Sequence, residues 1–571
     1  NSRKSDGQGF RDYRLEFEER NMTTNQIAGT HYLGAATREM LGGMSRLIDW
    51  LPEETSIEWF YSDSTAETDI PNRVLINSET VTDPVTGEVL SDRVTRQSSA
   101  AEYRFTALED EVEHYGWKGT LPIDFENSYL EVSGGYEHAQ KARTYEQSDF
   151  SLGYLSVSDQ SVLEGPLDQV FSDENLFERF PDDPLTQVDE SLQYVNDVQF
   201  DRQGSNTNSY LAATITDSVW GKVDWTFKDT WRFAVGARWE DYRQVAIEWN
   251  PWGFSEENPQ VTTDETVLEE RTFTEDEIYP AASITYMTDW WAETFQLRLG
   301  YSETAVRPDL RELTGSSYID PITGDLVRGN PGVVPSKVDN IDLRAEWFFG
   351  NGDNFTITLF QKDIEDPIEF FEIPASDTTI AREILNADSS EVRGIEIEGL
   401  KELAFLGGIF DTMFVQGNLT FQDTELVPGN PNDPDDTGTT QVSCFETETQ
   451  GQQVSVVKNN CELSGASEYV ANFMIGFDSY DSKHTASLIY NVFGERVFAF
   501  GRFGPDAIEQ PFESLDLTYF WYPTDRFTVK AKAQNLLGDT IEITRSEPGR
   551  KITVFEEDPG TTFSLAFSWE F

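Results

Sequence analysis

A strict alternation of apolar and polar residues constrains this chain more than any other feature. In the last eleven residues, TTFSLAFSWEF, one face carries Phe563, Leu565, Phe567, Trp569 and Phe571, and the other carries small or polar residues. Residues 231–240 alternate in the same way, with aromatic residues on one face and charged residues on the other. This period of two is typical of β-strands with one apolar and one polar face, and helical spacing of apolar residues is nearly absent.

Short turns alternate with much longer polar segments along the chain. Short polar stretches follow Phe227, Phe348, Phe477 and Tyr519 and read as hairpin ends. The longer polar stretches lie near 64–99, 158–206, 251–269, 306–335, 369–385, 425–465, 498–511 and 539–559. Bacterial membrane barrels have short periplasmic turns and longer extracellular loops, so the asymmetry predicts that Phe571 lies near the periplasmic end.

Composition and the absence of repeats distinguish a membrane β-barrel from a helical membrane protein and from a soluble propeller. Of 571 residues, 38% are hydrophobic and 13% are aromatic, and the mean hydropathy is -0.49. No apolar run approaches the roughly 20 residues of a membrane helix. A soluble propeller would repeat every 40 to 50 residues or so, and no such repeat occurs. We therefore predict an all-β fold, a transmembrane antiparallel β-barrel, with residues 1–571 as one domain.

The number of predicted strands bears on whether such a barrel closes. Counting between the turns gives about 17 strands, whereas single-chain bacterial barrels close with an even number. An open edge would leave backbone groups unpaired in lipid. We therefore expect several N-terminal strands to precede Asn1. No basic and apolar export signal follows Asn1, which agrees with a start that is missing.

Charge and reactive residues argue against several functions. The formal charge of -61 disfavours nucleic acid as a partner. The four His are scattered, and no GxSxG or Walker A sequence occurs, so we predict no enzyme, no catalytic residues, no metal site and no cofactor. Residues 430–438, NPNDPDDTG, could hold Ca²⁺ but lack EF-hand spacing, which favours a flexible acidic loop. Inward-facing charges such as Arg238, Glu240 and Arg344 are expected to bridge neighbouring strands.

The two cysteines lie in one polar segment. Cys444 and Cys461 have sixteen residues between them, which excludes a CxxC redox motif. A disulfide would close a long loop and suits an oxidising compartment such as the cell exterior. Two free thiols are the alternative.

Several segments resemble the barrel domain of TonB-dependent receptors. Residues 208–242 resemble the mid-barrel hairpin of that family, residues 295–315 its strand and RPD-type loop, and residues 327–349 the stretch that follows. AQNLLGD at 533–539 and the terminal Phe571 match its last hairpin. The resemblance runs from about residue 10 to the end.

The resemblance implies a barrel of about 22 strands around an N-terminal plug, so the plug and first strands would be missing here. It implies coupling to the TonB-ExbB-ExbD system through that missing region, contact with outer-membrane lipid and lipopolysaccharide, and recognition of Phe571 by the barrel assembly machinery. In that family ligands contact extracellular loops. The candidate loop aromatics here are Trp249, Trp252, Phe254, Tyr318, Phe370, Phe371, Phe498, Phe500 and Phe503, with packing inside the loops as their alternative role.

The function expected from this resemblance is import of a scarce nutrient across a Gram-negative outer membrane by TonB-driven plug movement. Siderophores, cobalamin, oligosaccharides and peptides are all substrates of such receptors, and the strands do not distinguish among them. The alternatives are a surface binding or adhesion barrel that docks a partner such as a surface lipoprotein, and a passive porin.

Overall fold

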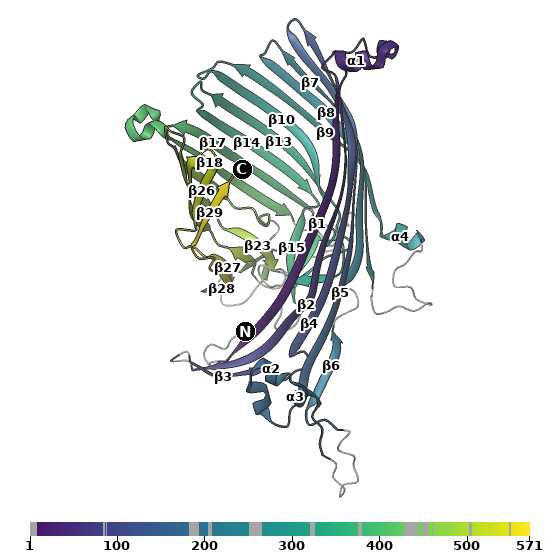
Figure 1. Ribbon diagram of the computed structural model, residues 1–571, viewed down its shortest axis with the longest axis vertical. Coiled ribbons are helices and arrows are strands. Elements are labelled where there is room, and N and C mark those ends of the chain that lie inside the picture. Colours follow the sequence, from purple (N-terminus) through teal and green to yellow (C-terminus); the bar gives the residue numbers. More distant parts are fainter. Residues whose placement is uncertain are drawn as a thin grey trace.

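A large antiparallel sheet dominates the computed structural model (Figure 1). The structure describes residues 8–83, 86, 88–181, 193–203, 208–249, 265–319, 326–374, 380–427, 444–447, 455–458, 461–501, 505–547 and 550–570. The sheet has 19 strands, of which β3 (Val89–Val94) and β6 (Asp197–Gln203) pair only with the ends of β2 and β5.

The other seventeen strands form one meander in which each strand pairs with the next. The sequence prediction of about 17 strands was a count of long strands of this kind, without the short strands in the long polar segments. Its strands are β1 (Gln8–Tyr32), β2 (Ser56–Thr82), β4 (Ala101–Phe125), β5 (Ser128–Ser156), β7 (Ser209–Phe227), β8 (Trp231–Trp249), β9 (Phe273–Thr288), β10 (Thr294–Val306), β13 (Ser336–Phe348), β14 (Asn354–Glu365), β17 (Ser389–Glu402), β18 (Met413–Val427), β21 (Tyr469–Asp478), β22 (His484–Phe493), β25 (Phe512–Thr524), β26 (Phe527–Gln534) and β29 (Thr562–Trp569).

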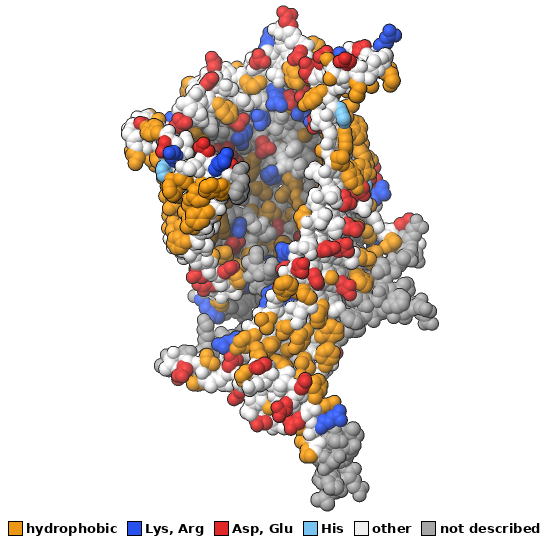
Figure 2. Space-filling view, in the orientation of Figure 1, with side chains coloured by type: hydrophobic (Ala, Val, Ile, Leu, Met, Phe, Trp, Pro, Cys, Tyr) orange, Lys and Arg blue, Asp and Glu red, His pale blue; other side chains and the backbone are white. Residues whose placement is uncertain are grey.

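The meander curls into a barrel wall around a hollow interior, which Figures 1 and 2 show. Among the described residues, β1 pairs only with β2 and β29 only with β26. The predicted fold class, an antiparallel all-β barrel, is confirmed by this sheet.

Apolar and polar residues that alternate in the sequence lie on opposite faces of the barrel wall. On β8, Val235 is 56% exposed and lies on the outer face, beside Ala282 of β9. The preceding residue, Ala234, pairs with Ser283 on the inner face. Because side chains of a strand point alternately to opposite faces, the outer face becomes an apolar band, seen as hydrophobic patches in Figure 2.

Acidic residues mark where the apolar band ends. Asp241 follows Trp239 on the outer face of β8, Glu113 precedes Tyr115 on β4, and Glu303 follows Tyr301 on β10. Charged side chains are costly in hydrocarbon. The boundary of the lipid-facing band therefore passes between these aromatic residues and the acids.

Most strand connections at the turn end of the barrel are short, as predicted. Two are longer and contain helices, which the sequence analysis did not predict. Residues 33–55 contain α1 (Ala35–Leu41) and the 3₁₀ helix η2 (Gly42–Leu47), and residues 403–412 contain η5 (Ala404–Leu406) and η6 (Gly408–Thr412).

The opposite end carries the long segments, four of which combine into an eight-stranded outer sheet. Its strands are β11 (Ser317–Ile319), β12 (Leu326–Arg328), β15 (Ile368–Pro374), β16 (Ile380–Asn386), β23 (Arg496–Gly501), β24 (Ala507–Glu509), β27 (Ile541–Glu547) and β28 (Arg550–Glu557). Other elements at this end are η3 (Gln160–Glu164), α2 (Leu167–Val170), α3 (Asp173–Phe177) and α4 (Glu265–Arg271), and a hairpin of β19 (Cys444–Thr447) and β20 (Ser455–Lys458).

One predicted loop is wrong. Residues 64–82, expected within a polar loop, are the outer half of β2, which pairs with β1 as far as Val81, with β4 as far as Ile76 and with β3 from Ser78 onwards. Beyond the lipid-facing band both faces of a strand meet water, so the alternation that reveals a strand in sequence is weak there. No helix of the described residues is long and apolar enough to span a membrane.

Candidate functional site

Ion pairs between strands line the inner face of the wall. Arg143 on β5 donates two hydrogen bonds to Asp110 on β4, at 2.6 and 2.7 Å. Arg238 on β8 contacts Glu137 on β5 at 2.8 Å and Glu240 on its own strand at 2.6 Å. As predicted, inward charges such as these bridge neighbouring strands, and each of these charges has an opposite charge beside it.

Residues 307–316, which follow β10, turn back against this wall and are called the re-entrant loop below. The Arg143 guanidinium reaches Asp309 at 3.1 Å. Leu310 and Leu313 pack into a buried cluster with Tyr210 and Ala212 of β7. The re-entrant loop is therefore held by both an ion pair and an apolar contact.

Arg307 adds a third attachment at the start of the re-entrant loop. Its guanidinium forms an ion pair with Glu240 of β8, and its central carbon lies 4.3 Å from the ring centroid of Tyr242. A guanidinium stacked on an aromatic ring and paired with a carboxylate has little freedom to move.

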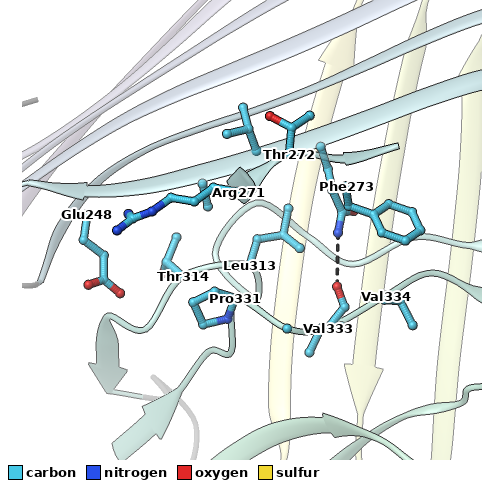
Figure 3. Close-up of a pocket in the computed structure, with 13 residues that line it drawn as sticks. Glu248, Arg271, Thr272, Phe273, Leu313, Thr314, Pro331, Val333 and Val334 are labelled. Carbon is cyan, nitrogen blue, oxygen red and sulfur yellow. Dashed lines mark hydrogen bonds between the residues drawn. The ribbon is translucent and has the colours of Figure 1, made fainter. Parts of the chain in front are cut away.

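A cavity of about 620 Å³ opens between the re-entrant loop and the wall (Figure 3). Its walls come from β8, from the end of α4 and the start of β9, from the re-entrant loop and from the segment before β13. The lining residues are Gln244, Val245, Ala246, Glu248, Arg271, Thr272, Phe273, Leu313, Thr314, Pro331, Gly332, Val333 and Val334. A volume of this size suits a small molecule.

Fixed polar contacts shape the cavity. The side-chain amide of Gln244 donates to the Val333 carbonyl at 3.1 Å, the contact drawn in Figure 3. The backbone N–H of Gly315 donates to Glu248 at 2.8 Å. These bonds tie the re-entrant loop and the segment before β13 to β8, so the cavity is largely pre-formed.

Arg271 is the cation of this cavity. It is exposed, and its side chain extends in the direction of Glu248 in Figure 3. Among the described residues, no carboxylate lies within ion-pair distance of it. Leu313, Pro331 and Val333 supply apolar surface nearby. A ligand with an acidic group and an apolar body would satisfy both features.

Four of the loop aromatics predicted to bind ligand pack within the outer sheet. Phe371 and Phe500 are 3% and 0% exposed, and their rings stack with centroids 5.1 Å apart. Tyr318 and Phe370 pack against the buried cluster of Val327, Val333 and Ile384. The geometry of these four residues is that of packing within the loops, the alternative considered for them.

Two of the five remaining aromatics, Phe498 and Trp249, lie in the part of the chain that the structure describes. Phe498 packs against the cluster that includes Ala499. Trp249 falls on the strand face opposite Gln244 and Glu248, since strand neighbours alternate. Trp252, Phe254 and Phe503 lie outside the described residues, as do Phe571 and the acidic segment 430–438. Ligand binding by the loop aromatics stays a prediction.

The predicted disulfide and the predicted absence of a metal site concern residues that the structure describes only in part. Cys461 is buried in a cluster with Phe371 and Phe500, but the side chain of Cys444 is outside the described part, so their disulfide stays a prediction. Within the described ranges, no group of three His, Cys, Asp or Glu side chains could hold a metal ion.

Glu369 is the most unusual ionisable group of the outer sheet. It is buried on β15 and accepts a hydrogen bond from the Ser464 hydroxyl. Burial raises the pKa of this carboxyl group from 4.5 to about 7. Hydrogen bonds from the side chain and the backbone of Ser464 offset only part of this effect of burial.

The described residues thus define a class: an outer-membrane type of β-barrel, apolar outside and charged inside, whose long outer segments form a cavity. Residues 58–536 match the family described as TonB dependent receptor-like, β-barrel. The chain belongs to this family, which is one of receptors and transporters. No curated protein matches the sequence at a significant level.

Solved structures share the fold at low identity. The copper transporter OprC is 12% identical with a TM-score of 0.50, covering 97% of this chain and 74% of its own. The siderophore receptor PiuA of Acinetobacter baumannii is 12% identical with a TM-score of 0.48, covering 90% of this chain. The ferric-catecholate import receptor Fiu of E. coli K12 is 12% identical with a TM-score of 0.48, covering 99% of this chain and 74% of its own. This chain spans 64% of the length of PiuA.

The cavity residues Arg271, Gln244 and Glu248 were not predicted from the sequence. The predicted ligand contacts were aromatic residues of the long loops, whereas the cavity is lined by one cation, by aliphatic side chains and by Phe273 of β9. Two signals pointed to the place: residues 295–315 and 327–349 were singled out by resemblance, and both border the cavity. The alternation of β8 also put Gln244 and Glu248 on the inner face.

Proposed function

We propose that this chain forms the barrel wall of an outer-membrane receptor that imports a nutrient with energy from the TonB system. The observation that carries the proposal is the pre-formed cavity on the inner wall, bordered by the re-entrant loop. A passive pore would not need a small-molecule cavity at its mouth. The outer sheet, built from four separate segments, further supports capture over free diffusion.

The chemistry of the cavity favours an anionic ligand. Arg271 supplies a positive charge, and Leu313, Pro331 and Val333 supply apolar contact. PiuA and Fiu are described as receptors for a siderophore and for a ferric catecholate, and such metal chelates are candidates for this chain. Acidic oligosaccharides and peptides carry the same kind of group.

We also propose the partners that the family resemblance implies. The TonB-ExbB-ExbD system would act through an N-terminal region with a plug. Lipid and lipopolysaccharide would surround the apolar band, and the barrel assembly machinery would recognise the last strand with Phe571. A surface lipoprotein bound to the outer sheet is a further candidate partner.

Substitution of Arg271 tests the cavity. In a strain that lacks the native gene, the full-length protein should support uptake of at least one member of a panel of ferric siderophores, cobalamin, acidic oligosaccharides and peptides. Arg271→Ala should reduce uptake at low substrate concentration by roughly tenfold, which corresponds to about 1.4 kcal/mol for one charge-assisted contact, and Arg271→Lys should restore part of it. The matched control is Arg243→Ala, because Arg243 pairs with Asp241 on the outer face of β8.

Removal of TonB tests the energy coupling separately. Uptake should fall to the background of the deletion strain. Uptake that persists without TonB would contradict the proposal and indicate a porin. If no panel member is taken up and a protein partner co-purifies in stoichiometric amount, a docking role replaces transport.

A further inference from the structure

The segment between β1 and β2, residues 33–55, is a folded unit at the turn end of the barrel. Its two ends are joined by the Leu33 N–H, which donates to the Thr55 carbonyl at 2.8 Å. The Arg38 guanidinium donates to the carbonyls of Leu33 at 3.0 Å and Leu51 at 2.7 Å. One side chain thus clamps the beginning of the segment to its end.

This segment presents large apolar side chains that nothing covers in the structure. Met40 is 81% exposed, Met44 64%, Leu47 73% and Trp50 75%. No residue of α1 or η2 is buried. The indole N–H of Trp50 is already satisfied by the Leu47 carbonyl at 2.8 Å, so its ring can enter an apolar environment without losing a hydrogen bond.

The position of the segment indicates what covers it. It joins β1 and β2 next to Ile57 and Trp59, which are on the outer face of the wall. In Figure 1, α1 projects to the outside of the wall and not across the hollow interior, and Figure 2 shows hydrophobic side chains gathered on it. The exposed apolar surface is therefore continuous with the lipid-facing band.

We propose that residues 33–55 lie on the periplasmic leaflet as an interfacial anchor, with Met40, Met44, Leu47 and Trp50 at the boundary of headgroups and acyl chains. Short helices with large apolar residues on one side and charges on the other bind membranes in this way, and Trp is enriched at that depth. The charged residues Glu39, Arg46 and Asp49 would remain in water or among headgroups.

The anchor has a physical consequence for the barrel. Because Arg38 makes the segment one unit with the ends of β1 and β2, insertion of the segment would hold these two strands at a defined depth. The inference requires that the barrel crosses a membrane, but it does not depend on which substrate is transported.

Depth-dependent fluorescence quenching tests the anchor. The full-length protein would be placed in vesicles of phosphatidylethanolamine and phosphatidylglycerol, with an environment-sensitive dye attached at Leu47→Cys or, as the control, at Asp49→Cys. Lipids brominated near the headgroup end of the acyl chain should quench the dye at position 47 several-fold more than at position 49. Lipids brominated near the chain end should quench position 47 less.

Two outcomes would overturn the inference. Equal and weak quenching at both positions would place the segment in water. A dye at position 47 that is shielded from water-soluble quenchers, yet not quenched by brominated lipid, would mean that protein covers this surface. Circular dichroism and heat-modified gel mobility of each variant establish that the barrel has folded.

Discussion

At the scale of single residues, Glu369 links the outer sheet to pH. Its carboxyl group binds a proton more tightly in the folded sheet than in an unfolded chain, because burial raises its pKa from 4.5 to about 7. Folding of the sheet is therefore favoured at low pH, and this advantage is lost as the pH rises from about 4.5 towards about 7. Above that range the sheet is less stable than at low pH by roughly 3 kcal/mol.

Glu369→Gln should remove this pH dependence. Hydrogen exchange of the peptides that cover β15 and β16 should slow in the variant at pH 8, relative to the native protein, and change little at pH 5 after correction for intrinsic rates. Exchange that depends on pH equally in both proteins would show that Glu369 is not the group responsible.

Arg545 is a second residue with a measurable contribution. It joins β27 to β15 through an ion pair with Glu372, whose carboxylate is buried, so Arg545→Ala removes this contact between two strands of the outer sheet. We expect the outer sheet to lose roughly 1.5–3 kcal/mol of stability, the usual contribution of a hydrogen bond to a charged group, measured as faster proteolysis of the outer segments in membranes.

The control for Arg545 is an exposed pair of the same type. Arg93 contacts Glu79 at 3.0 Å, and both side chains are more than 40% exposed. Arg93→Ala should cost only about 0–1 kcal/mol. Equal effects of the two substitutions would contradict the structural role of the buried pair.

At the scale of elements, the last strand offers a test of the two faces. Leu565 is 61% exposed on the outer face of β29, and Ala566 follows on the inner face. Leu565→Lys should destabilise the barrel by roughly 2–4 kcal/mol, because a charge at mid-depth enters hydrocarbon, whereas Ala566→Lys should cost far less. The midpoint of urea unfolding in lipid vesicles measures both. A larger cost at Ala566 would reverse the assignment of faces.

Some elements of the fold could be predicted from the sequence and others could not. The alternation in β8 and β29 predicted both strands and their faces, because lipid on one side and water on the other impose a period of two. The outer half of β2 escaped prediction because both of its faces meet water. Residues 33–55 escaped because two short helices broken at Gly42, which has a φ of 54°, leave no regular helical period.

The cavity could not be predicted in the same way. Arg271 and Leu313 are far apart in sequence and meet only because the re-entrant loop folds back on β7 and β8. Residue type gave no signal, since arginine and leucine occur throughout the chain. The aromatics of the outer sheet were conspicuous in sequence for a different physical reason, which is that they form its core.

At the scale of the whole molecule, every proposed role requires that the barrel wall separates hydrocarbon from a hydrated interior. The inner ion pairs, the re-entrant loop and the cavity have their proposed roles only if that interior contains water and ligand. The apolar band and the anchor at residues 33–55 have theirs only if the exterior is lipid.

Nitroxide scanning of β8 and β9 tests this wall most directly. Spin labels at single positions 233–237 and 281–285 of the full-length protein in lipid vesicles report collisions with oxygen, which concentrates in lipid, and with a water-soluble nickel chelate. Oxygen accessibility should peak at Phe233, Val235 and Ala237 on β8, and at Ala282 and Ile284 on β9, because the paired strands place these residues on one face. Accessibility without a period of two, or with peaks at Ala234 and Ser283, would contradict the account.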